Sequence, residues 1–169
     1  MKKLGLVAMA AMMMAGPALA AEKITVETSK GCSFDIKLRA DLAPKHVAQI
    51  TKLVGEKFYD GIIFHRVIPG FMAQTGDPDG TGMGGSKEPN LAAEFSKEHY
   101  ARGTVGMART ADPNSANSQF FIMLAENGSL DGQYTVWGQV DEAGMACVDK
   151  IEKGEPPATP DKMTKVTVQ

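Results

Sequence analysis

The feature that most constrains this chain is a succession of short stretches with strand-type patterning, separated by glycine and proline turns. Apolar and polar residues alternate through residues 24–26 and 34–38, and residues 29–31 supply the turn of a predicted hairpin. Further strands are predicted at residues 105–108, 120–124, 135–140 and 166–168. Many short strands favour a closed or sandwiched β structure over parallel βαβ units, and pattern alone leaves barrel and sandwich open.

Two helical patterns interrupt the strands. The first begins at Pro44, carries apolar residues at helical spacing as far as Val54, and ends at Gly55. The second is shorter and places Met145, Val148 and Ile151 on one face. We see no internal repeat or linker after residue 20, so residues 21–169 are expected to form one domain.

Residues 1–20 have the features of a secretory signal peptide. A positive start at Lys2 and Lys3 precedes an uncharged, mostly apolar run, and small residues lead up to Ala20, after which cleavage is expected. The alternative is an uncleaved membrane anchor, but the run is shorter than the roughly 20 residues that span a bilayer. We therefore expect a periplasmic protein with no membrane attachment after cleavage.

The net charge and the distribution of metal-binding side chains argue against nucleic-acid binding and metal binding. A formal net charge of -2 provides no basic field for nucleic acid. Cys32 and Cys147 would lie in an oxidising compartment, yet sequence cannot place them within bonding distance, so two separate thiols are the favoured interpretation. The scattered histidines His46, His65 and His99 form no ligand cluster, so no metal is expected.

Residues 75–90 form a glycine-rich stretch that predicts a long surface loop. No Gly-Lys-Ser/Thr follows, which argues against a phosphate cradle. Asp77 and Asp79 lack the further acidic ligands of a calcium loop and are interpreted as solvated turn residues.

Two segments, residues 64–74 and 117–122, carry the candidate chemistry. Arg66 is a permanent cation within an apolar stretch, and Gln74 and Gln119 supply amides. On extended chain these groups could share one surface with large apolar side chains, which is the general form of a small-ligand site. The apolar candidates are Phe71, Met72, Phe121 and Leu130.

Such a site suits a reaction that breaks no covalent bond. The sequence offers no nucleophile–base pair or paired carboxylates, so a hydrolase is poorly supported. Rotation about a peptide bond has a barrier of about 18–20 kcal/mol that comes from amide resonance. A guanidinium aimed at the proline nitrogen would weaken that resonance, and lowering the barrier by roughly 7 kcal/mol would accelerate rotation about 10⁵-fold. Arg66 is the candidate for this role.

Residues 64–77 and 117–122 resemble the two signature segments of cyclophilins, and the likeness extends over residues 24–168. The resemblance implies a mainly β fold, a closed eight-stranded antiparallel barrel capped by two α-helices, with peptidyl-prolyl cis-trans isomerase activity and no cofactor. Arg66 matches the catalytic arginine of the family. The proline pocket is matched by Phe71, Met72, Phe121 and Leu130. The polar residues that hold arginine and peptide are matched by Gln74 and Gln119.

Further residues that match the family are expected at the rim of the site. Ala108 and Arg109 lie on the segment that contacts the residue before proline, and Tyr134 replaces a common histidine and can still close the pocket. His65 is interpreted as a hydrogen-bonding support, because rotation needs no proton transfer. Ser129 stands where many eukaryotic members have a tryptophan, so weak cyclosporin binding is expected.

The expected function is an isomerase that assists the folding of exported proteins, in the pattern of bacterial secreted cyclophilins. Its partners would be unfolded or partly folded polypeptides with Xaa-Pro bonds, and a monomer is expected. The alternative is a binding module that holds clients in the same groove without turnover. The sequence leaves open the client proteins and the preference for the residue before proline, because Arg109 and Thr110 replace the usual Asn-Ala pair.

Overall fold

The computed structural model describes residues 21–169, so the predicted signal peptide lies outside the described residues. Eight strands form one antiparallel sheet in the order β3-β4-β6-β5-β7-β2-β1-β8. The strands are β1 (Lys23–Thr28), β2 (Ser33–Leu38), β3 (Arg66–Ile68), β4 (Met72–Thr75), β5 (Thr104–Met107), β6 (Phe120–Met123), β7 (Val136–Gln139) and β8 (Met163–Val168). The helices are α1 (Pro44–Gly55), the single turn η1 (Gly128–Leu130) and α2 (Glu142–Val148).

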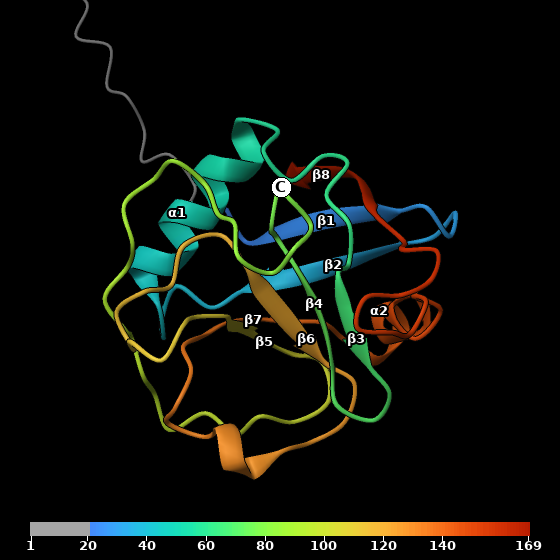
Figure 1. Ribbon diagram of the computed structural model, residues 1–169. Coiled ribbons are helices and arrows are strands. Elements are labelled where there is room, and N and C mark those ends of the chain that lie inside the picture. Colours follow the sequence, from blue (N-terminus) through green and yellow to red (C-terminus); the bar gives the residue numbers. More distant parts are fainter. Residues whose placement is uncertain (1–20) are drawn as a thin grey trace, which may run out of the picture.

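The sheet curves into a half-barrel, and α1 and α2 lie on either side of it (Figure 1). Helix α1 packs against β7 and β8, and α2 packs against β2. The closed barrel implied by the resemblance is not shown, because the edge strands β3 and β8 do not pair with each other. An isolated bridge between Ile63 and Lys162 joins the segments that precede these two strands. Among residues 21–169, no helix is both long and apolar enough to cross a membrane.

The predicted elements are largely confirmed, with small shifts at their ends. The hairpin of β1 and β2 forms as expected, and α1 has the predicted limits from Pro44 to Gly55. Helix α2 ends at Val148, earlier than its apolar pattern suggested, although Ile151 is still buried at 1% exposure. The side chain of Asp141 caps α2 by accepting a hydrogen bond from the backbone N–H of Gly144 at 2.7 Å.

Alternation along the central strands separates two apolar clusters. On β6, Phe120 and Ile122 belong to the large core inside the curved sheet, whereas Phe121 and Met123 belong to a smaller cluster on the outer face. Successive residues of a strand point to opposite faces, so one short strand contributes to both clusters. The outer cluster forms the floor of the site described below.

The interpretation of Cys32 and Cys147 as separate thiols is wrong, because the two residues form a disulfide with Cα atoms 5.8 Å apart. Cys32 lies in the turn that leads into β2, and Cys147 lies in the last turn of α2. Because α2 packs on β2, residues 115 positions apart in sequence become neighbours. The hydroxyl of Thr28 lies 3.6 Å and 3.7 Å from the two sulfur atoms.

Candidate active site

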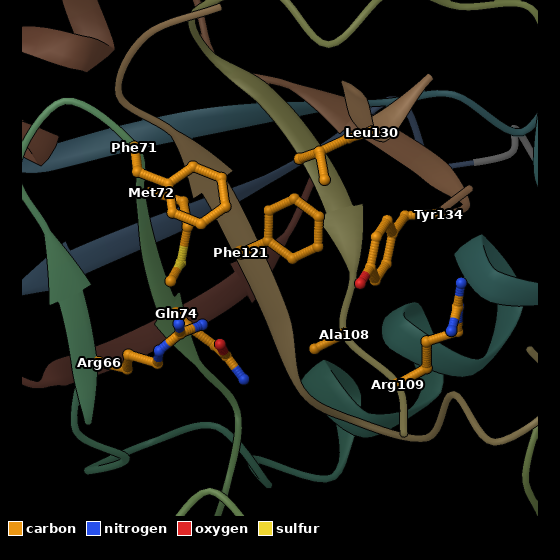
Figure 2. Close-up of a pocket in the computed structure, with 9 residues that line it drawn as sticks. All are labelled: Arg66, Phe71, Met72, Gln74, Ala108, Arg109, Phe121, Leu130 and Tyr134. Carbon is orange, nitrogen blue, oxygen red and sulfur yellow. The ribbon is translucent and has the colours of Figure 1, made fainter. Parts of the chain in front are cut away.

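The two motif segments meet on the outer face of the sheet, where three adjacent strands place side chains in one row. Arg66 on β3 is paired with Gln74 on β4, and Gln74 is paired with Phe121 on β6. Directly paired residues of neighbouring strands project to the same face, so the three side chains stand together. Figure 2 shows the Arg66 guanidinium extending toward Gln74 and Met72.

These side chains border a cavity of about 200 Å³, which we call the cleft. Its lining consists of Arg66, Phe71, Met72, Gln74, Ala108, Arg109, Phe121, Leu130 and Tyr134. Arg66 and Gln74 lie at one end, Arg109 and Tyr134 lie at the other, and the Phe121 ring stands between them (Figure 2). The cleft therefore combines an apolar floor with polar groups at both ends.

The ring of Phe121 is fixed by aromatic neighbours and by a missing side chain. It stacks on Tyr100 with ring centres 5.8 Å apart and meets Tyr134 edge-on at 5.7 Å. Gly106 on β5 is paired with Phe121, and a Cβ atom at that glycine would lie only 2.6 Å from the ring. The floor of the cleft thus depends on a glycine that the motif analysis did not select.

The two predicted amides form a relay that ends at the glycine-rich loop. Gln74 Nε2 donates to Gln119 Oε1 at 2.9 Å. Gln119 Nε2 in turn donates to the carbonyl oxygens of Gly82 and Gly84, at 3.0 Å and 2.8 Å. Gln119 lines a second cavity of about 520 Å³, which shares Gln74, Ala108 and Arg109 with the cleft.

The interpretation of Asp77 as a solvated turn residue is wrong, because this carboxylate is buried at 1% exposure. It accepts hydrogen bonds from the backbone N–H groups of Asp79, Thr81, Gly82 and Gly84, at distances of 2.6–3.2 Å. Burial alone would raise the pKa of Asp77, but these backbone donors outweigh it and hold that pKa below its usual value. Asp77 thereby fixes the loop whose carbonyls orient Gln119.

Arg66 has an acidic partner that sequence reasoning missed. Its Nε donates to the Glu155 carboxylate at 2.8 Å, and the two side chains are 43% and 54% exposed. Because Nε is the inner nitrogen of the guanidinium, this bond leaves the terminal nitrogens available to the cleft. An acidic residue 89 positions away carries no local sequence signal that would have linked it to Arg66.

His65 does not line the cleft but lines a third cavity, of about 550 Å³, which shares Arg66 and Gln74 with the cleft. The imidazole is buried at 6% exposure, and neither ring nitrogen has a hydrogen-bond partner within residues 21–169. Burial lowers the pKa of His65, and the nearby Arg66 cation lowers it further, although Asp77 acts in the opposite direction. The expected hydrogen-bonding support by His65 therefore does not appear in this structure.

Arg109 is held at the far end of the cleft by an aromatic ring and by backbone oxygens. Its guanidinium carbon lies 4.5 Å from the centre of the Tyr134 ring. Nε and one terminal nitrogen donate to the carbonyl of Gln133 at 3.2 Å and 2.7 Å, and the other terminal nitrogen donates to the carbonyl of Thr110 at 2.9 Å.

The structure brings most of the predicted site residues together. All nine residues that line the cleft belong to the predicted site, whereas Gln119 lines the second cavity and His65 lines the third. Within residues 21–169, no group of three or more His, Cys, Asp or Glu side chains could hold a metal ion. What the arrangement offers is binding and polarisation, without a nucleophile poised for attack.

Comparisons with known proteins agree with the geometry. The family model of the cyclophilin type peptidyl-prolyl cis-trans isomerase/CLD matches residues 23–168. A probable peptidyl-prolyl cis-trans isomerase of Brucella suis biovar 1 (strain 1330) is 56% identical over 150 residues, covering 79% of this chain and 76% of that protein.

Two solved structures are similar over most of the chain. The crystal structure of cyclophilin AquaCyp293 from Hirschia baltica has a TM-score of 0.79 at 31% identity, covering 87% of this chain and 73% of that one. A cyclophilin type isomerase of Cryptosporidium parvum, crystallised in the presence of the dipeptide Ala-Pro, has a TM-score of 0.78 at 26% identity, covering 87% of this chain and 98% of that one.

Proposed function

The chain belongs to the cyclophilin-type peptidyl-prolyl cis-trans isomerases, and from this premise we propose that Arg66 catalyses rotation of Xaa-Pro bonds held in the cleft. The observation that carries the proposal is the cross-strand row in which Arg66, Gln74 and Phe121 project side by side. The row brings a cation and an apolar surface suited to a pyrrolidine ring to the same face of the sheet, with Gln74 between Arg66 and Phe121. The dipeptide Ala-Pro present with the Cryptosporidium relative supports the same substrate class.

The mechanism follows from the electronic structure of the amide. In the planar bond the proline nitrogen shares its lone pair with the carbonyl, whereas in the twisted state the lone pair returns to nitrogen. The terminal N–H groups of Arg66 attract this lone pair and so favour the twisted state over both planar forms. The apolar side chains Phe71, Met72, Phe121 and Leu130 clamp the ring while the preceding carbonyl turns.

The polar residues have positioning roles in this proposal. Gln74 stands beside Arg66, and Gln119 fixes the orientation of the Gln74 amide. Ala108 and Arg109 border the part of the cleft that continues into the second cavity, where we place the residue before proline. No proton transfer is required, which is consistent with the absence of a hydrogen-bonded base in the described part of the cleft.

The test is a proline-peptide isomerisation assay on Arg66→Ala. We expect kcat/KM to fall by at least about tenfold, because the charge that stabilises the twisted amide is lost. Arg39→Ala is a matched control, since Arg39 pairs with Asp41 and Glu98 and does not line the cleft. Wild-type activity in Arg66→Ala with an unchanged circular dichroism spectrum would refute the catalytic role. If Arg66→Ala still suppresses client aggregation, holding of unfolded chains is a separate function.

We also propose that the protein acts on unfolded exported proteins in the periplasm. The supporting features are the signal-type segment at residues 1–20 and the Cys32–Cys147 disulfide, which is typical of oxidising compartments. Expression of the full chain with a C-terminal tag, followed by fractionation and N-terminal sequencing, tests this. A mature chain that begins at Ala21 in the periplasmic fraction is expected, and an intact Met1 in the cytoplasmic fraction would contradict it.

Weak cyclosporin binding and a monomeric state complete the proposal. Ser129 lies in η1 beside Leu130, and its hydroxyl donates to Asn127 at 2.6 Å, so it offers the drug little apolar surface. Ser129→Trp should strengthen inhibition of the isomerase by cyclosporin, and an unchanged inhibition curve would contradict this assignment. Analytical ultracentrifugation should give one species with the mass of a single chain.

A further inference from the structure

Arg109 occupies the junction between the two cavities that a bound peptide would follow. It lines the cleft, where the proline ring is proposed to bind, and it also lines the second cavity. Figure 2 shows its side chain beside Tyr134, at the opposite end of the cleft from Arg66. A peptide held by its proline near Phe121 would therefore pass Arg109 before it reached the second cavity.

The guanidinium of Arg109 is fixed in place and still has donors to offer. Stacking on Tyr134 and the bonds to the Gln133 and Thr110 carbonyls restrict its rotation. A guanidinium has five N–H groups, and these bonds use three of them. Within residues 21–169, each terminal nitrogen keeps one N–H without a protein acceptor, which suits a carboxylate held by two bonds.

Arg109 has no acidic side chain within ion-pair distance in the part of the chain that the structure describes. None of the ion pairs formed within residues 21–169 includes Arg109. The second cavity contains no acidic lining residue, and Arg109 is the one charged group among its described lining residues. The remaining lining side chains there are mainly hydroxyls and amides, which accept a polar substrate group without repelling it.

We propose that Arg109 gives the isomerase a preference for substrates in which the residue directly before proline is Glu or Asp. The inference rests on the proposed function, because it assumes that proline binds in the cleft and that the preceding residue lies toward the second cavity. The substrate carboxylate accepts hydrogen bonds from the two remaining N–H groups of the guanidinium. A fixed guanidinium loses little conformational freedom on binding. Its ion pair with the substrate carboxylate is therefore stronger than the pair that a mobile surface arginine would form.

A purely structural role is the competing explanation for the same contacts. Arg109 also joins residues 109–110 to residues 133–134, so its loss could loosen the cleft for every substrate alike. Selectivity between two substrates separates the explanations, because a loosened cleft slows acidic and neutral peptides by the same factor.

The experiment measures kcat/KM by NMR exchange on peptides Ala-Xaa-Pro-Phe in which Xaa is Glu, Gln or Lys, each normalised to its uncatalysed rate. Glu and Gln have the same shape and differ in charge. For the wild-type chain we expect Glu to be preferred over Gln by about three- to tenfold, and Lys to be the poorest. The preference should shrink at high salt because screening weakens a partly exposed pair.

Variants test whether Arg109 is the source of the preference. Arg109→Gln should bring the Glu to Gln ratio close to unity, and Arg109→Lys should keep part of it. Lys87→Gln is the charge control, because it removes one exposed cation near the second cavity without altering the lining, so the ratio should persist.

Two results would overturn the inference. They are equal activity of the wild-type chain on Glu and Gln peptides, and a preference that survives in Arg109→Gln. If instead no peptide is accelerated at all, the proposed function itself fails, so the two failures are distinguishable.

Discussion

The two ends of the cleft each carry an arginine, and the surroundings of the two side chains differ in a way that supports the separate roles proposed for them. Arg66 lies on an edge strand and forms an ion pair with Glu155. Arg109 follows β5 and stacks on Tyr134, with no acidic partner among the described residues. A cation held in place by an acidic partner can act on a bond dipole beside it. A cation without such a partner attracts a negatively charged group of the substrate.

The largest expected difference comes from replacing each arginine by lysine. Arg66→Lys should lower kcat/KM on a neutral Xaa-Pro peptide by about 10–100-fold, because an ammonium cannot bond Glu155 and face the proline nitrogen at once. Arg109→Lys should cost far less on the same peptide, since its charge is proposed to act on acidic substrates. Protease-coupled or NMR kinetics would show the difference. Equal losses in the two variants would mean that the two ends do not have separate tasks.

The amide relay provides the next test, because it belongs to the Arg66 end. Gln119→Ala removes the acceptor of Gln74 and frees the carbonyls of Gly82 and Gly84. We expect kcat/KM to fall by about tenfold, as a misplaced group beside the reacting bond is costly. The matched control is Gln133→Ala, which keeps the backbone carbonyl that Arg109 uses. An equal loss in the control would point to general loosening of the site.

A smaller effect is expected from the acidic partner of Arg66. Glu155→Gln keeps a hydrogen-bond acceptor and removes the negative charge, and both side chains are about half exposed. We expect kcat/KM to fall by about two- to threefold, in line with the small value of exposed ion pairs. High salt should reduce wild-type activity toward that of the variant. A rise in activity would show instead that Glu155 restrains Arg66 rather than orienting it.

Local sequence patterns predict the elements of the fold, and the two motifs predict the site. Alternation predicted the β1–β2 hairpin, and helical spacing with Pro44 and Gly55 predicted α1, because both signals depend on near neighbours in sequence. The motif residues Arg66, Gln74 and Phe121 were expected on one surface. Only the strand register shows that they occupy a single cross-strand row.

What the sequence did not predict depends on contacts between distant segments. The Cys32–Cys147 disulfide requires α2 to pack on β2, and the Arg66–Glu155 pair joins residues that no shared motif connects. Asp77 was misjudged although a signal existed, because an aspartate before a glycine-rich run is suited to capturing backbone N–H groups. Gly106 matters because the rings of Phe121 and Tyr100 lie against it, a contact that no local pattern reveals.

The smallest expected effect concerns the pH dependence of stability at the Arg66 end. Burial and the neighbouring Arg66 lower the pKa of His65 in the folded chain, with Asp77 opposing them. The unfolded chain therefore binds a proton at His65 more readily, with a pKa of about 6.5, so stability is lost as the pH falls through that value. His46 has a pKa lowered by burial and contributes in the same direction, so the comparison must be made between variants.

Between pH 7 and pH 5.5 the Tm of the wild-type chain should fall by a few degrees more than that of His65→Gln, measured by calorimetry. Arg109, which is not among the groups that shift the pKa of His65, serves as the reference: Arg109→Gln should keep the full wild-type loss. If His65→Gln keeps that loss as well, His65 is not the titrating group, and the distinction between the two ends then rests on kinetics alone.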